Sequence, residues 1–143
     1  MRSGMVVLLL CALVLPLGLF ADAAAKKDAN AGVRRSDIKP LFKEPPRGDV
    51  TKPTVITNDE ELAKAFPDKE LQIRIKKEVD FSKEKLLYFA WGGSGQDKFA
   101  FKGVIKQEVV FIYTPGLTRD LRPHAYLYAV PKDATWTVDT LRR

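Results

Sequence analysis

Two polar segments of the chain carry the residue types that could do chemistry. The first closes an apolar run with a glycine-rich stretch, Trp91-Gly92-Gly93-Ser94-Gly95-Gln96-Asp97. The second is Arg119-Asp120-Leu121-Arg122-Pro123-His124, which contains the single histidine of the chain. Serine, histidine and aspartate can form a hydrolytic triad, and the backbone N–H groups of a glycine loop can bind an anion. Loops on a rigid sheet also often carry partner binding.

The spacing of the first segment does not match two well-known catalytic loops. A phosphate-binding loop needs G-x-x-x-x-G-K-[ST] followed by a helix, whereas Lys98 comes here without the second glycine. A nucleophile elbow needs G-x-S-x-G, and Gln96 stands at its last position. The simplest structural interpretation is a hairpin loop in which Asp97 fixes the turn. A triad of Ser94, His124 and Asp97 stays open as a hydrolase hypothesis, but we assign no catalytic residue.

The favoured interpretation is a surface for a protein partner that both segments form together. Its expected residues come from the glycine-rich stretch and from the basic positions of the second segment: Trp91, Gly92, Gly93, Ser94, Gly95, Gln96, Asp97, Arg119, Arg122 and His124. Within it, Arg122 or Arg119 is expected to pair with Asp97 across the neighbouring loops. One histidine cannot form a histidine cluster, so we expect no metal site and no cofactor.

The N-terminal residues have the pattern of a secretory signal peptide. Arg2 is a basic n-region, Val6–Leu15 is apolar, and Ala21-Asp22-Ala23 is an A-x-A cleavage site. The apolar stretch is shorter than the roughly 20 residues that a membrane-spanning helix needs. We therefore expect residues 1–23 to be removed on export to the periplasm or beyond, leaving a protein without a membrane anchor. Cleavage also removes Cys11, the one cysteine, so no disulfide is expected.

Charge argues against a nucleic-acid partner. The chain has a net charge of +6, but residues 24–53 hold eight basic and four acidic residues, whereas 54–141 hold thirteen of each. A nucleic-acid-binding face needs a local basic surplus that displaces counterions. Residues 24–53 are rich in Ala, Lys and Pro without periodicity, which predicts a disordered leader. Residues 54–141 then form a single domain.

Patterning predicts an α+β fold: an antiparallel sheet of four to six strands with one or two N-terminal helices packed on it. A capping box at Thr57-Asn58 begins a helix that Pro67 ends. Residues 68–78 fit a helix or a strand, and the helix is favoured by the charges at its ends. The expected strands follow at short spacing, at Thr54–Ile56 before the helices and then at Lys85–Trp91, Lys98–Ile105, Glu108–Tyr113, His124–Val130 and around Trp136.

The aromatic residues fall mostly on these strands, and core packing is favoured over a platform for stacking bases or sugars. The run Leu86–Trp91 reads as a central strand buried on both faces. Among the aromatics, Trp91 and Tyr126 are expected to come nearest to the surface.

Val79-Asp80-Phe81, the run Leu86–Trp91 into Gly92-Gly93, and the ending Pro131-Lys132 resemble the PrcB-like domain of exported bacterial proteins. The resemblance covers about residues 54–136. It implies a non-enzymatic accessory domain that binds and stabilises a partner, for which a secreted protease complex is the precedent. Residues 94–97 interrupt the family's glycine turn, which an aromatic residue usually follows, and the resemblance brings no catalytic residue.

A second resemblance concerns three residues, Arg122-Pro123-His124. They are similar to the Arg-Pro-aromatic loop of chagasin-type inhibitors of cysteine proteases, which use loops at one end of a β-sandwich. The inhibitors' Asn-Pro-Thr-Thr-Gly segment is absent from the chain. Protease inhibition is therefore the alternative function.

Overall fold

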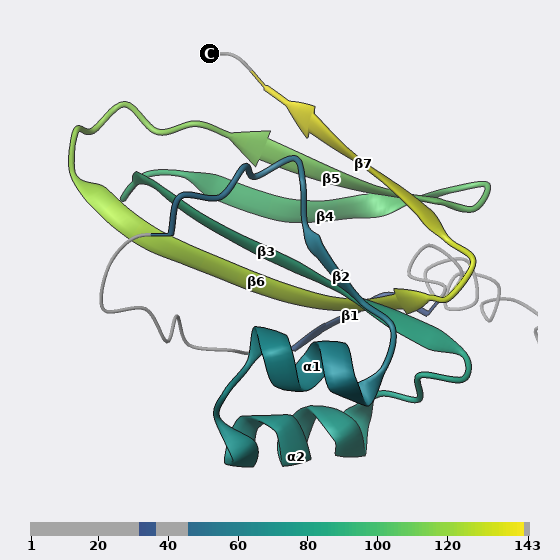
Figure 1. Ribbon diagram of the computed structural model, residues 1–143. Helices are drawn as coiled ribbons and strands as arrows, with labels where there is room; N and C mark the ends of the chain where they lie inside the picture. Colours follow the sequence, from purple (N-terminus) through teal and green to yellow (C-terminus); the bar gives the residue numbers. More distant parts are fainter. Residues whose placement is uncertain (1–31, 37–45, 142–143) are drawn as a thin grey trace, which may run out of the picture.

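The structure, a computed structural model, describes residues 32–36 and 46–141 (Figure 1). The expected signal peptide lies outside these residues. The described elements are two helices and seven strands, in chain order β1 Arg34–Ser36, β2 Thr54–Ile56, α1 Asp59–Ala65, α2 Lys69–Glu78, β3 Glu84–Ser94, β4 Lys98–Ile105, β5 Glu108–Thr114, β6 Leu121–Pro131 and β7 Thr135–Thr140. No helix in this part of the chain has the length and apolar character to cross a membrane.

Both helices begin at side-chain caps that the sequence contains. Asn58 caps α1 by accepting a hydrogen bond from the Glu61 amide (2.9 Å), and the Glu61 carboxylate accepts one from the Thr57 amide (2.7 Å). Asp68 caps α2, which confirms the favoured helix at 68–78. Ile73 is 54% exposed, which fits a helix. In a strand, Leu71, Ile73 and Ile75 would have shared one face, and Ile73 would have been buried with the others.

The strands form two sheets that pack face to face (Figure 1). The first has the order β1-β6-β3-β2 with every pair antiparallel, and the second has the order β4-β5-β7. The α+β class expected from the sequence is confirmed, with the strands divided between two sheets. β7 runs parallel to β5, because β6 crosses back through the other sheet and returns the chain to the start of β5.

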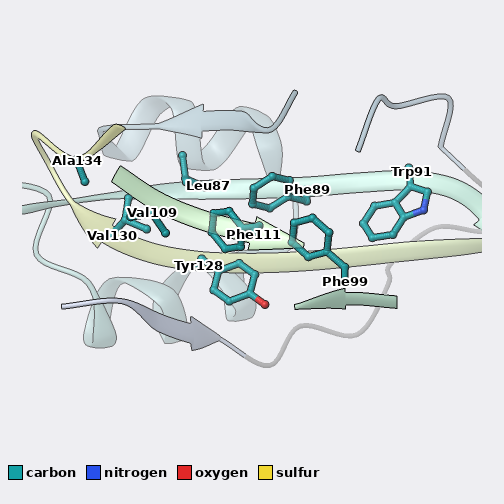
Figure 2. Close-up of a cluster of buried hydrophobic side chains, with 9 residues drawn as sticks. All are labelled: Leu87, Phe89, Trp91, Phe99, Val109, Phe111, Tyr128, Val130 and Ala134. Carbon is teal, nitrogen blue, oxygen red and sulfur yellow. The ribbon is translucent and has the colours of Figure 1, made fainter. Parts of the chain in front are cut away.

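A hydrophobic core fills the space between the two sheets (Figure 2). β3 contributes Leu87, Phe89 and Trp91 to this core. Its alternate residues Leu86 and Tyr88 face the helices, where a second apolar cluster lies. β3 is therefore buried on both faces, as the continuous apolar run predicts.

The prediction of a disordered leader is wrong for Arg34–Ser36, which pairs with β6 as strand β1. Arg34 Nη2 donates to Glu84 Oε2 (2.6 Å) and to the carbonyl oxygen of Glu78 (2.7 Å). These charge-assisted bonds hold a short strand that composition alone marks as unstructured. Gly48 lies so close to the Ala90 carbonyl that a side chain has no room. Residues 24–31 and 37–45 of the expected leader are outside the described part.

We expect Leu87→Ala to lower the free energy of unfolding by about 2–5 kcal/mol, because it opens a cavity between the sheets. Leu87 is fully buried, whereas Leu141 is half exposed. Leu141→Ala is the matched control and should change stability by less than about 0.5 kcal/mol. Urea denaturation followed by circular dichroism measures both. Equal losses for the two variants would contradict the assigned core.

Candidate functional site

The two polar segments singled out in the sequence meet at one end of the sandwich (Figure 1). The β3–β4 connection is a tight turn closed by a hydrogen bond from the Asp97 amide to the Ser94 carbonyl (2.9 Å). The β5–β6 loop lies beside it, and Ser94 Oγ and Thr118 Oγ1 are 2.5 Å apart. Residues 94–97 and 115–122 together are called the tip below.

Asp97 holds the tip to the core. Its carboxylate accepts hydrogen bonds from Trp91 Nε1 (2.9 Å), the Tyr113 hydroxyl (3.0 Å) and the Gly116 amide (2.7 Å). The residue is 9% exposed, so these donors replace water around a buried charge. Because Trp91 lies in β3, Tyr113 in β5 and Gly116 in the β5–β6 loop, one side chain joins both sheets and the second polar segment.

These contacts determine the protonation behaviour of the site. Burial by itself raises the pKa of Asp97, but the hydrogen bonds from Gly116, Trp91 and Tyr113, together with the charge of His124, outweigh burial and hold that pKa below its ordinary value. Burial, with the adjacent carboxylate, raises the pKa of Tyr113 to about 12. Asp97 is therefore an anion and Tyr113 a neutral donor at neutral pH.

The expected ion pair between Asp97 and an arginine is wrong. Arg122 Nε instead donates to Asp120 Oδ2 at 2.7 Å, and the Gly95 amide donates to Asp120 Oδ1 at 3.2 Å. The carboxylate of Asp97 is turned inward to the aromatic donors, so the nearby Asp120 is the acid that the arginine reaches. The bond from Gly95 to Asp120 adds a further link between the two segments.

Three glycines allow this close approach. A side chain at Gly93 would collide with the Asp97 carboxylate and lie 2.9 Å from Trp91 Nε1. One at Gly95 would meet Asp120 and Arg122, and one at Gly116 would meet Ser94 and lie 2.7 Å from Gln96 backbone and side-chain carbons. The glycines of this region are thus needed for packing between the segments.

Trp91 does not reach the surface, contrary to expectation. It is 3% exposed and stacks against His124, with ring centroids 4.9 Å apart, and against Tyr126, at 5.6 Å. Tyr126 and His124 are both half-buried. Trp91 and Asp97 therefore support the tip from within, while a partner would meet the residues around them.

The hydrogen bonds of the proposed triad do not follow a catalytic pattern. His124 Nε2 lies 2.8 Å from the Ser94 carbonyl oxygen, whereas a triad needs the serine hydroxyl there. Ser94 Oγ accepts from the Gln96 amide (3.1 Å) and contacts Thr118. The Asp97 carboxylate accepts hydrogen bonds from Trp91 and Tyr113. This arrangement orders a turn.

Metal ligation finds no support in the described residues, which contain no group of three or more His, Cys, Asp or Glu side chains placed to hold an ion.

The inhibitor-like motif Arg122-Pro123-His124 differs from the expected loop, since all three residues lie within β6. Opposite them in β3 are Gly93, Gly92 and Trp91.

The outer surface of the tip is formed by four of the expected residues and by two leucines that sequence reasoning missed. Gly95, Gln96, Arg119 and Arg122 are exposed, and Gly92, Gly93, Ser94 and His124 are half-buried. Leu117 is 77% exposed and Leu121 is 68% exposed. The available signal was two large apolar residues in a segment of Pro, Gly and charged residues, outside the alternating pattern of any predicted strand.

No family model, curated protein or solved structure matches the chain. The function is therefore inferred from the geometry of the tip and from the resemblances in the sequence.

We predict that Asp97→Asn lowers the free energy of unfolding by about 2–4 kcal/mol at neutral pH, because an amide N–H₂ would face buried donors. The folded pKa of Asp97 is depressed. Its ionised form therefore contributes stability above the unfolded pKa of about 3.9, and this contribution is lost as pH falls through the folded pKa.

Urea denaturation from neutral to acidic pH tests both statements. The stability difference between the wild type and Asp97→Asn should shrink as pH falls below about 4. Asp133→Asn, in the exposed β6–β7 turn, is the matched control and should leave neutral-pH stability nearly unchanged. A constant difference across the pH range would show that Asp97 is not stabilising as an anion.

Gly116→Ala should cost about 1–3 kcal/mol, because the added methyl group forces the β5–β6 loop away from the β3–β4 turn. The indole N–H resonance of Trp91 reports the same change by NMR, since its acceptor Asp97 also binds the Gly116 amide. Unchanged stability and an unshifted indole resonance would mean that the two segments are not closely packed.

Proposed function

We propose that the protein is an exported, non-enzymatic accessory domain that binds and stabilises a protein partner through its tip. The single observation that carries the proposal is that two leucines of the tip are exposed on an ordered backbone: Leu117 in a loop that Gly116 ties to the core, and Leu121 at the start of β6. Exposed apolar side chains on an ordered, polar-rimmed surface are typical of protein interfaces.

The order of the tip favours binding, because a loop that is already fixed loses little conformational freedom when a partner docks. The bonds of Gly116 to Asp97 and of Gly95 to Asp120 hold the loop backbone. Immobilising a flexible side chain on binding costs about 0.5–1.5 kcal/mol. A preformed loop restricts that cost to the contacting side chains.

Two parts of the proposal come from the sequence, and a third is supported by the hydrogen bonds at the tip. Export rests on the signal-peptide pattern of residues 1–23. A protein partner in the cell envelope or outside it follows from export, and the PrcB-like resemblance suggests a secreted protease complex as that partner. The non-enzymatic character is supported by the hydrogen bonds of Ser94 and His124, which order a turn.

Inhibition of a cysteine protease is the second candidate function. It is favoured by the two loops that meet at one end of a two-sheet sandwich, which resembles the end of a β-sandwich where the chagasin-type inhibitors carry their three binding loops. Adding the purified protein to papain-like proteases distinguishes the two functions. Slowed hydrolysis that Leu117→Ser relieves would favour inhibition.

Photo-cross-linking tests the proposed function with a matched pair of sites. Gln96 lies in the hairpin turn at the tip, and Gln107 lies in the β4–β5 turn at the opposite end. A photoreactive residue at Gln96 should capture one defined protein in the native envelope fraction, and the same residue at Gln107 should not. The double variant Leu117→Ser, Leu121→Ser should abolish capture, whereas Ile105→Ser, which removes an exposed apolar residue from the far end of β4, should leave it unchanged.

Capture of the same protein from both ends of the molecule would contradict a tip-specific function, and so would capture that survives loss of both leucines. Purified partner with and without the domain then tests the stabilising role, because a ligand that binds only the folded partner must raise its melting temperature.

A further inference from the structure

The charges that the tip offers to a partner are basic. Arg119 and Arg122 are exposed. Both acids of the tip already have donors within it, since Asp97 is buried against its three donors and the half-buried Asp120 accepts from the Gly95 amide and from Arg122. A partner therefore meets guanidinium groups, while the two carboxylates are taken up by the tip itself.

The arginines alternate with the two exposed leucines along the chain. Leu117 and Arg119 lie in the β5–β6 loop, and Leu121 and Arg122 begin β6. Asp120 engages only Nε of Arg122 within the described residues, which leaves the two terminal nitrogens of this guanidinium to donate outward. A guanidinium presents its donors in a planar fork that matches a carboxylate.

On this basis we propose that the tip recognises an acidic peptide segment of its partner, in which Asp or Glu side chains flank an apolar anchor. The anchor packs on Leu117 and Leu121, and the carboxylates pair with Arg119 and Arg122. The inference rests on the proposed function and adds the chemistry of the partner to it.

A protein segment fits this surface better than an anionic membrane does. Asp120 lies between Arg119 and Leu121 in the chain and forms part of the same surface, and a carboxylate is costly to bring into a bilayer with its neighbouring leucine. Leu121 is also the first residue of β6, paired with Ser94 of β3. Its backbone is therefore fixed to the sheet and cannot follow the side chain into lipid.

Selection from a phage-displayed library of short random peptides tests the proposal directly. The bait is the full mature protein, and the double variant Leu117→Ser, Leu121→Ser serves for counter-selection. We expect the selected peptides to be enriched in Asp and Glu around Leu, Phe or Trp. No enrichment, enrichment in basic residues, or failure to select any peptide would each overturn the acidic-partner inference.

Charge variants then test the selected peptide by fluorescence anisotropy. Arg119→Gln should weaken its binding by about tenfold, equivalent to about 1.4 kcal/mol, whereas Arg119→Lys should retain most of it. Lys106→Gln, at the opposite end of the molecule, is the matched control and should have no effect. Raising the salt concentration from about 0.05 M to about 0.5 M should weaken binding to the wild type more than to Arg119→Gln.

Vesicles of phosphatidylcholine with phosphatidylglycerol complete the experiment. Binding to these vesicles that requires Leu117 and Arg119 would overturn the proposal in favour of a membrane surface.

Cross-linking at Gln96 separates this inference from the proposed function. If cross-linking depends on the leucines while Arg119→Gln leaves it intact, the proposed function stands and the acidic partner is excluded. If neither change alters cross-linking, both proposals fail.

Discussion

A buried carboxylate with three hydrogen-bond donors connects the two sheets at the end of the sandwich that carries the tip. Trp91 belongs to the first sheet, Tyr113 to the second, and Gly116 to the loop that joins them. A charge removed from water is tolerated only where donors stand at fixed positions. The position of Asp97 thus requires that β3, β5 and the β5–β6 loop keep one arrangement. The backbone of the tip is therefore fixed relative to the core.

The rest of the fold supplies a rigid base for this arrangement. β3 and β6 are the two longest strands and pair along their whole length. Figure 1 shows them running past the helices to the tip, so the surface proposed to bind a partner stands on the central strands of the first sheet. Helices α1 and α2 cover the other face of that sheet near its opposite end, through Leu62 and Ile75.

Features with a local physical cause could be predicted from the sequence. The caps at Asn58 and Asp68 and the two-sided burial of β3 follow from neighbouring residues. The parallel pairing of β7 could not be predicted, because it depends on β6 crossing in another sheet. β1 was also missed, since its three residues pair with the distant β6 and Arg34 bonds to the distant Glu84.

The inner and outer sides of the candidate site were the hardest part to assign. A glycine-rich loop beside arginines suggested an ion pair with Asp97, but a buried Trp91 needs a partner for its own N–H. That requirement turns the carboxylate inward and leaves the two leucines, Leu117 and Leu121, on the outer surface together with the arginines. Side-chain choices of this kind depend on contacts across the sheets, which residue spacing does not encode.

Amide hydrogen exchange at Gly116 tests most directly whether the tip is preformed. Its N–H donates to Asp97 Oδ1 at 2.7 Å. We predict that this amide exchanges slowly in the free protein, with protection that approaches that of the core amides of β5, because the bond opens only when the sandwich opens. Exchange as fast as in an unstructured peptide would contradict a preformed tip.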